Sequence, residues 1–421
     1  MTKIRSLFRD SNFSLLWSSQ VLSNFGDRLN QMALIGLIYA RTPGSTVQLA
    51  KLLSFTIIPV FLIGPIAGIY VDRWNRKHTM IFCDLIRGSM VLFIPLVIAY
   101  SKSMVPVYIL VFMIFSATRF FLPSKLAIIP DIVPKDKLLL ANSLTSTTMM
   151  IATIVGFGLG GIIVGCLGAR GGFYIDAGTY FISALMISFV VLKLKPVLPP
   201  EPALKETLQK IIRKTILDDI KEGFRYLNGH KDIRMIAVTM FFLMAGVGSI
   251  YIIIIVFVQE LLKSSTEHLG LLAMFLGAGL FLGSVIYGRF GAKLCKRKVI
   301  NVGLAVTGLV IILFSAGLQM WPNFFVAAVL SMILGLFAAP IVVSSNTLLH
   351  EVMADEMRGR IFSSMDLIMH VGFLVFMFLT SLIAERIGQG QLLIATGIIF
   401  SFIGVLRLII GNKTKGKKEA Y

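Results

Sequence analysis

The sequence predicts an all-α membrane protein with twelve transmembrane helices arranged as two six-helix halves. First, 56% of its 421 residues are hydrophobic and only 14% are charged, whereas soluble domains average about 25% charged residues. Second, the apolar residues gather in twelve runs, each long enough to approach the roughly 20 residues that a membrane-spanning helix needs. Third, Lys and Arg are distributed unevenly among the segments that connect these runs.

The twelve runs follow one another along nearly the whole chain. None shows the alternating pattern, about ten residues long, of a transmembrane β-strand. Several runs exceed 22 residues, so we expect their helices to tilt, kink or extend beyond the bilayer. The runs lie near residues 13–40, 47–71, 79–100, 105–124, 138–165, 173–192, 235–258, 268–288, 299–318, 323–347, 361–384 and 391–411.

The net charge of +19 is explained by topology rather than by a nucleic-acid partner. If the N-terminus is cytoplasmic, the cytoplasmic segments hold 30 of the 40 Lys and Arg residues and the opposite loops hold five. This is the asymmetry of the positive-inside rule. It predicts a multi-pass protein of the inner (plasma) membrane with both termini cytoplasmic, in contact with membrane lipids that include anionic ones. No nucleic-acid binding is expected.

The two halves of the chain repeat each other at an offset of 220 residues. Segment 131–143 aligns with 351–363, and the basic loop after the second run aligns with the one after the eighth. We therefore expect an N-terminal six-helix half at 1–192, a cytoplasmic linker with a basic amphipathic helix at 193–234, and a C-terminal half with a basic tail at 235–421. Many transporters build a midplane substrate site from such repeats.

A polar stripe interrupts the first apolar run. Gln20, Asn24, Asp27 and Gln31 follow spacings of three and four residues, which place them on one helical face, and Arg28 adjoins them. A charge deep in a membrane helix costs about 2.5–3.5 kcal/mol on insertion scales and usually marks a pathway. We interpret this helix as lining a route for substrate or protons. The alternative is a charge pair that only locks two helices together.

The loop after the second run carries a recognisable motif. Its residues are Gly68, Asp72, Arg73, Asn75, Arg76 and Lys77. The motif resembles the cytoplasmic loop signature of the major facilitator superfamily, with Asn75 in place of a glycine. Because Asn tolerates left-handed backbone conformations, we expect the turn to persist. The resemblance implies the fold of that superfamily and a conformational latch in which Asp72 meets a helix N-terminus, a contact that contributes about 0.3–1 kcal/mol.

The fifth run contains Gly156, Gly160 and Gly161, with Phe157 after the first of them. This segment is similar to the antiporter signature of the same superfamily, in which a proline stands at the position of Phe157. Small residues four positions apart permit close helix contact. In the fourth run, Arg119 lies about a turn and a half beyond the position of the antiporter arginine, which Ile114 occupies here.

One branch of the superfamily fits the whole chain best. Segments 23–27, 42–45, 64–65, 222–227 and 358–362 resemble the macrolide efflux proteins and the enterobactin exporter. Segments 25–27 and 123–142 are also similar to lysophospholipid transporters. The resemblance implies efflux of an amphipathic solute, with lysolipid transport as the alternative.

Further charged groups lie within or beside the apolar runs. Asp366 and His370 share a face of the eleventh run, where a carboxylate and an imidazole can exchange protons near neutral pH. The alternative is a histidine hydrogen-bonded in the core. Asp84 and Arg87 are expected to form a structural pair beside the loop motif. No metal site is expected.

The chain contains no glycine-rich nucleotide-binding motif, so transport must draw on a gradient. The sequence predicts a secondary active transporter, not an enzyme, that couples efflux of small amphipathic drug-, macrolide- or siderophore-like molecules to the H⁺ gradient by alternating access. It is expected to act as a monomer without a cofactor. A lysophospholipid transporter of the same fold and a non-transporting sensor or scaffold remain as alternatives.

Overall fold

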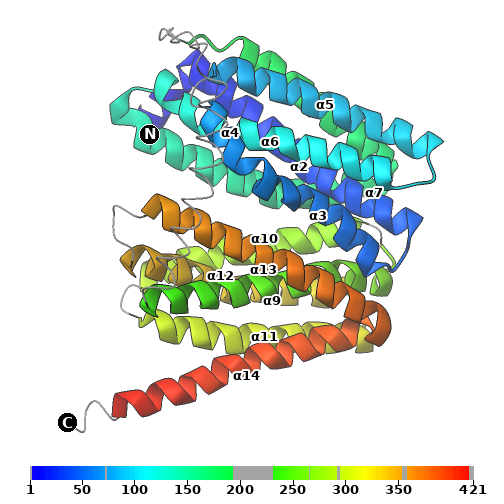
Figure 1. Ribbon diagram of the computed structural model, residues 1–421, viewed down its shortest axis with the longest axis vertical. Coiled ribbons are helices and arrows are strands. Elements are labelled where there is room, and N and C mark those ends of the chain that lie inside the picture. Colours follow the sequence, from blue (N-terminus) through cyan, green and yellow to red (C-terminus); the bar gives the residue numbers. More distant parts are fainter. Residues whose placement is uncertain are drawn as a thin grey trace, which may run out of the picture. The chain divides into compact units, whose positions relative to one another are not determined.

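A computed structural model describes residues 2–71, 74–192, 231–264, 266–291, 294–352 and 358–416. Within these ranges every regular element is a helix (Figure 1). The predicted linker helix and the motif residues Asp72 and Arg73 lie outside the described residues. The all-α membrane fold predicted from the sequence is confirmed.

The helices of the first half of the chain are α1 (Thr2–Phe8), α2 (Ser11–Arg41), α3 (Thr46–Leu62), α4 (Gly64–Val71), α5 (Arg76–Tyr100), α6 (Val105–Ile132), the short 3₁₀ helix η1 (Lys135–Lys137) and α7 (Leu138–Ser188). Those of the second half are α9 (Lys231–Leu261), α10 (Glu267–Phe290), α11 (Lys296–Met320), α12 (Phe324–Val352), α13 (Arg358–Ile387) and α14 (Gln389–Gly416).

These elements account for the twelve predicted spans. Nine helices of the described residues are long and apolar enough to cross a membrane. One of them, α7, is two spans joined at Gly168, whose φ of 71° breaks the helix. The remaining spans are α2, whose polar stripe lowers its hydropathy, and α3 with α4, which are separated at Ile63.

The 220-residue repeat is visible in the helix boundaries themselves. Helix α2 spans residues 11–41 and α9 spans 231–261, while α5 spans 76–100 and α11 spans 296–320. The residues that precede α5 and α11 also share a conformation: φ and ψ are −69° and 110° at Asn75, and −65° and 111° at Cys295. The register predicted from the sequence is therefore confirmed.

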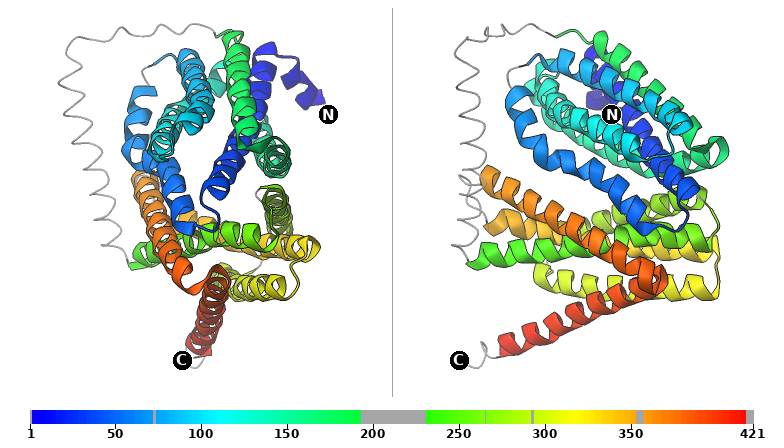
Figure 2. Two further views of the ribbon diagram at one scale, coloured as in Figure 1. Left: turned by 90° about the vertical axis from the view of Figure 1, so that its right-hand side faces the viewer. Right: turned by 45° about the vertical axis from the view of Figure 1, so that its right-hand side comes forward.

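The helices form two compact units, described here one at a time. The first comprises the described residues within Met1–Ala40 and Lys51–Leu217, and the second those within Arg41–Ala50 and Asp218–Tyr421. In the first unit, α5 packs against both α6 and α7. In the second, α9 packs against α13, α10 against α12, and α11 against both α12 and α14 (Figure 2).

The turn between α2 and α3 belongs to the second unit because it is bonded to α13. The Ser45 hydroxyl and the Val47 backbone N–H both donate to the Glu385 carboxylate, at 2.8 and 3.1 Å. The Thr46 hydroxyl donates to the Ser381 carbonyl at 2.8 Å. Gly44 is required in this turn because its φ of 78° is left-handed and strained for residues with a Cβ.

The distribution of side chains is that of a protein surrounded by lipid. In α5, the ionisable Asp84 is 0% exposed, whereas Phe82 and Phe93 are 64% and 51% exposed. A soluble protein would place these groups the other way round. The exposed apolar surface of the helices therefore supports their assignment as membrane spans.

Candidate functional site

A buried ion pair lies inside α5 in the first unit. Asp84 and Arg87 are 0% and 1% exposed, and the Arg87 guanidinium donates to the Asp84 carboxylate one turn away. The other carboxylate oxygen of Asp84 accepts a hydrogen bond from the Ser183 hydroxyl of α7 at 2.7 Å. The two residues were expected to pair beside the loop motif. They do pair, but the described contacts join them to α7 instead.

Aromatic rings connect the Arg87 guanidinium to α2. Its central carbon lies 4.1 Å from the centre of the Phe121 ring and 4.4 Å from that of Tyr180. The buried Tyr180 hydroxyl in turn donates a hydrogen bond to Asp27, which is only partly buried. Contacts therefore run from Arg87 of α5 through Tyr180 of α7 to Asp27 of α2.

A second buried carboxylate lies one turn of α7 before Tyr180. Asp176 is 0% exposed, accepts a hydrogen bond from the Thr179 hydroxyl at 3.4 Å and is hydrogen-bonded by the Asn30 side chain. Its Oδ2 atom has no hydrogen-bond partner among the described residues. Gly26 allows this close approach, because a Cβ there would lie 2.0 Å from Thr179 Oγ1 and 2.4 Å from Asp176 Oδ1.

The glycine stripe of the fifth span packs against the charged part of α2. A Cβ at Gly156 would lie 3.0 Å from the Cγ atom of Arg28, and one at Gly160 would lie 3.3 Å from the Cα atom of Leu29. Gly161 is also buried in α7. The small residues therefore bring α7 close to Arg28, as expected for such a stripe.

The side chain of Arg28 lies along this interface. It donates to the Gln31 amide oxygen at 3.1 Å, and its guanidinium lies 5.2 Å from the centre of the Phe157 ring. Phe157 occupies the position where the antiporter signature has a proline. The backbone of α7 is helical there, since its break is at Gly168.

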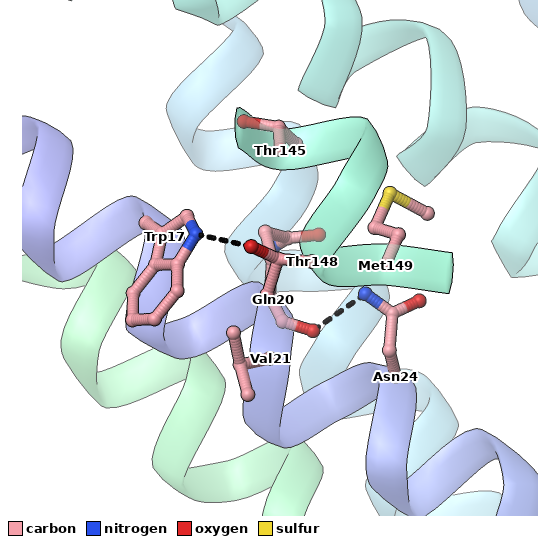
Figure 3. Close-up of a pocket in the computed structure, with 7 residues that line it drawn as sticks. All are labelled: Trp17, Gln20, Val21, Asn24, Thr145, Thr148 and Met149. Carbon is pink, nitrogen blue, oxygen red and sulfur yellow. Dashed lines mark hydrogen bonds between the residues drawn. The ribbon is translucent and has the colours of Figure 1, made fainter. Parts of the chain in front are cut away.

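The polar stripe of α2 also borders a shallow pocket against α7. Gln20 is buried, and Asn24, half-buried, donates to the Gln20 carbonyl at 2.6 Å. The pocket has a cavity volume of about 10 Å³, room for about one water molecule, so a larger ligand requires the surrounding side chains to move. Its lining comprises Trp17, Gln20, Val21 and Asn24 of α2 with Thr145, Thr148 and Met149 of α7 (Figure 3).

Arg119 is half-buried in α6, whereas Ile114 is buried with 1% exposure. The position where the resemblance would place the antiporter arginine is therefore part of the apolar core in this protein. The buried cation near Asp27 is instead Arg87 of α5, which contacts the Tyr180 ring.

The described part of the loop motif holds helices together. Arg76 forms an ion pair with Asp131 of α6 at 2.5 Å, and the Lys77 ammonium donates to the Ser188 carbonyl, the last residue of α7, at 2.6 Å. Gly68 lies in α4. Asn75 does not use the left-handed conformation that it tolerates: its backbone is extended, and its side chain caps α5 by accepting a hydrogen bond from the His78 N–H.

In the second unit, Asp366 and His370 lie together on α13. His370 Nδ1 is 2.8 Å from the Asp366 carbonyl oxygen and 3.4 Å from the Asp366 carboxylate. The Asp366 side chain is 54% exposed and that of His370 is 33% exposed. The predicted pairing is therefore present, in a more exposed setting than that of Asp27. No group of three or more metal-binding side chains occurs among the described residues.

Sequence reasoning missed several members of the cluster around Asp27. Asp176 was detectable as a carboxylate inside the sixth apolar run, with Thr179 and Tyr180 three and four residues later. Lys125 was assigned to a loop, but α6 continues to Ile132 and buries it with 3% exposure. Only the fold shows that these residues lie close enough to Asp27 to interact with it electrostatically.

The cluster belongs to one half of the repeat. At the 220-residue offset, the ionisable side chains around Asp27 align in sequence with uncharged residues of the second half. Asp27, Asp84, Arg87, Lys125, Asp176 and Tyr180 correspond to Val247, Leu304, Thr307, Ser345, Thr396 and Phe400. Because the second unit forms the same helices without these charges, helix packing does not require them.

A duplicated bundle of membrane-spanning helices with ionisable groups inside one half defines a membrane transporter. The chain belongs to the family described as "Transmembrane secretion effector", a branch of the major facilitator superfamily, which it matches over residues 4–411. Its relatives are transporters, and the protein is not an enzyme.

Two relatives and one solved structure illustrate the similarity. Macrolide efflux protein A of Streptococcus pyogenes is 23% identical, over 96% of each chain. A homologue of the multi-drug resistance efflux pump PmrA from Lactococcus lactis is 25% identical, over 86% of each chain. A bacterial homologue of the iron transporter ferroportin, in the inward-facing state, superposes with a TM-score of 0.71 at 15% identity, over 95% of this chain and 98% of the other.

Proposed function

We propose that this protein is a secondary active transporter of the inner membrane that exports amphipathic small molecules in exchange for protons, with both termini in the cytoplasm. The observation that carries the proposal is the setting of Asp27. It is partly exposed, yet hydrogen-bonded to Tyr180 beside a fully buried ion pair. The efflux activity named for its relatives, macrolide and multi-drug export, supports the direction and solute class.

The charges of the cluster suit exchange of one positive charge for another. Asp27, Asp84 and Asp176 interact electrostatically with Arg87, and Asp27 also acts on Lys125. Arg87 is ion-paired with Asp84, whereas Lys125 acts on Asp27 without forming an ion pair with it among the described residues. A proton or a cationic solute group would neutralise Asp27, which is the carboxylate of the three that is accessible to either.

Each neighbour of Asp27 has a role in this scheme. Tyr180 orients the carboxylate through its hydroxyl, and Arg87 holds Tyr180 in place through its ring. The glycine stripe at Gly156 and Gly160 keeps α7 against α2. Asp366 and His370 form a second proton-exchanging pair in the other half, since they lie 3.4 Å apart on α13.

The proposal is tested by a substrate screen in proteoliposomes, with and without a pH gradient. Macrolides, cationic dyes and a lysophospholipid serve as solutes for the wild type and for Asp27→Asn. We expect gradient-driven export of an amphipathic drug that Asp27→Asn abolishes at normal protein levels, and a flattened pH dependence in His370→Gln. Undiminished gradient-driven transport by Asp27→Asn would remove Asp27 from the coupling step. Lysophospholipid movement that ignores the gradient would favour the lipid transporter.

A further inference from the structure

We propose that Lys125 and the pocket between α2 and α7 bind an anionic group of the transported amphiphile. The inference rests on the proposed transport function and narrows its substrate class, because Asp27 alone would recognise only protons and cations. It starts from the Lys125 side chain, which is 3% exposed within α6. Among the described residues its ammonium contacts the Met149 sulfur at 3.2 Å, and it forms no ion pair with a carboxylate.

A buried ammonium without a carboxylate partner is costly. Lys is almost never fully buried unless it is paired, and burying an uncompensated charge carries a penalty of several kcal/mol. A thioether is only a weak acceptor and compensates little of this penalty. Two charges act on Lys125 electrostatically: Asp27 attracts it and Arg87 repels it. An anionic ligand would supply the missing partner.

Met149 connects the ammonium to the pocket. Its thioether is the atom that Lys125 contacts, and its side chain is part of the pocket lining (Figure 3). Methionine side chains are unbranched and adopt alternative rotamers readily. Rotation of Met149 would therefore open the pocket to the Lys125 ammonium without any change of the backbone.

The rest of the lining carries no charge that would oppose an anion. No carboxylate lines the pocket, and the surface that it exposes in this conformation is apolar. The Gln20 and Asn24 amide groups already donate to the Ser19 hydroxyl and to the Gln20 carbonyl, so a ligand oxygen would have to replace these bonds. The Trp17 indole N–H donates to the Thr148 hydroxyl at 3.3 Å, a long bond that a ligand oxygen could replace.

The depth of the pocket agrees with an amphipathic ligand. Trp17 lies six residues after the start of α2, and Lys125 lies seven residues before the end of α6. At 1.5 Å per residue, both are about 10 Å from a helix end, which is just inside the hydrocarbon region of a bilayer. A phosphate or carboxylate bound there leaves its hydrocarbon chain within the apolar zone.

Binding is measured with Trp17 as the reporter. The chain contains three Trp residues, so Trp74→Phe with Trp321→Phe leaves Trp17 as the sole fluorophore. The full-length protein, purified in an uncharged maltoside detergent, is titrated with four decyl probes: the phosphate, the phosphocholine, the trimethylammonium and the glucoside. Lys125→Gln removes the charge, Lys125→Arg retains it, and Met149→Leu removes the sulfur but preserves the apolar volume.

We expect Lys125→Gln to weaken binding of decyl phosphate and decyl phosphocholine at least tenfold and to leave the other two probes within twofold. Lys125→Arg and Met149→Leu should bind the phosphate probes within about threefold of the parent. Equal losses for charged and uncharged probes would reduce Lys125 to a packing residue. Unchanged phosphate binding in Lys125→Gln would also overturn the proposal.

The source of the anion is a separate arm of the experiment. Inorganic phosphate is titrated alongside decyl phosphate, and we expect it to bind at least a hundredfold more weakly. Equally tight binding of inorganic phosphate would contradict an amphipathic ligand. Because this assay reads binding rather than transport, its failure is distinguishable from failure of proton-coupled export.

Discussion

The ion pair inside α5 offers a quantitative test of the polar cluster. Arg87→Met removes a cation that is 1% exposed and leaves the Asp84 carboxylate, 0% exposed, with the Ser183 hydroxyl as its remaining described hydrogen bond. Asp84→Leu leaves the Arg87 cation between two aromatic rings. The double variant removes both charges. At these positions the second half carries Leu304 and Thr307, so the fold accepts uncharged residues there.

The expected magnitudes follow from burial. Breaking a buried ion pair by removing one partner costs about 3–5 kcal/mol, whereas replacing both partners by apolar residues is often neutral. We therefore expect Arg87→Met to lower the free energy of unfolding by about 3–5 kcal/mol. Asp84→Leu should cost about 1–2 kcal/mol less, because cation–π contacts contribute up to about 2 kcal/mol to a desolvated cation. The double variant should lie within about 1.5 kcal/mol of the wild type, which gives a coupling energy of at least about 2.5 kcal/mol.

The assay is reversible unfolding in mixed micelles titrated with sodium dodecyl sulfate, followed by circular dichroism. A cost of 3 kcal/mol changes the unfolding equilibrium about 150-fold, which shifts the midpoint measurably. A double variant that loses as much as the two single variants combined would refute a self-contained ion pair. It would show instead that Ser183 and Tyr180 depend on each charge separately.

Three further predictions concern helix packing and capping. Gly26→Ala should destabilise the protein by about 1–3 kcal/mol, the cost of overpacking, because its Cβ would lie 2.0 Å from Thr179 Oγ1; Gly178→Ala, with no atom within 4 Å, is the matched control. Equal thermal midpoints for these two variants would contradict the close packing of α2 and α7. Asn75→Ala should cost about 1 kcal/mol through loss of the cap of α5. Conversely, Cys295→Asn should stabilise α11, which has no side-chain cap, and a destabilised Cys295→Asn would show that the two caps are not equivalent.

The helices and their repeat were predictable because hydrophobicity and length decide membrane spans. The 220-residue offset could be read from a few aligned charges, and the matching boundaries of α2 and α9 and of α5 and α11 confirm it. The end of α6 was misplaced by eight residues. Its last turns contain Lys125, Pro130 and Asp131, whose burial and pairing depend on neighbouring helices.

The candidate site was only partly predictable, for a similar reason. Helical periodicity placed Gln20, Asn24, Asp27 and Gln31 on one face without the fold. The partner of Asp27 could not be derived this way, because Tyr180 is 153 residues distant in sequence. Periodicity describes one helix at a time, whereas hydrogen bonds between helices depend on which helices pack together.

Coupling of solute and proton movement at Asp27 is the central claim, and substrate-evoked proton flux tests it most directly. A pH-sensitive dye is trapped in proteoliposomes, an exported drug is added, and proton movement is recorded alongside exchange of labelled drug without a gradient. The account predicts that the wild type moves protons when drug is added, whereas Asp27→Asn exchanges drug but moves no protons. Substrate-evoked proton flux that persists in Asp27→Asn would contradict it.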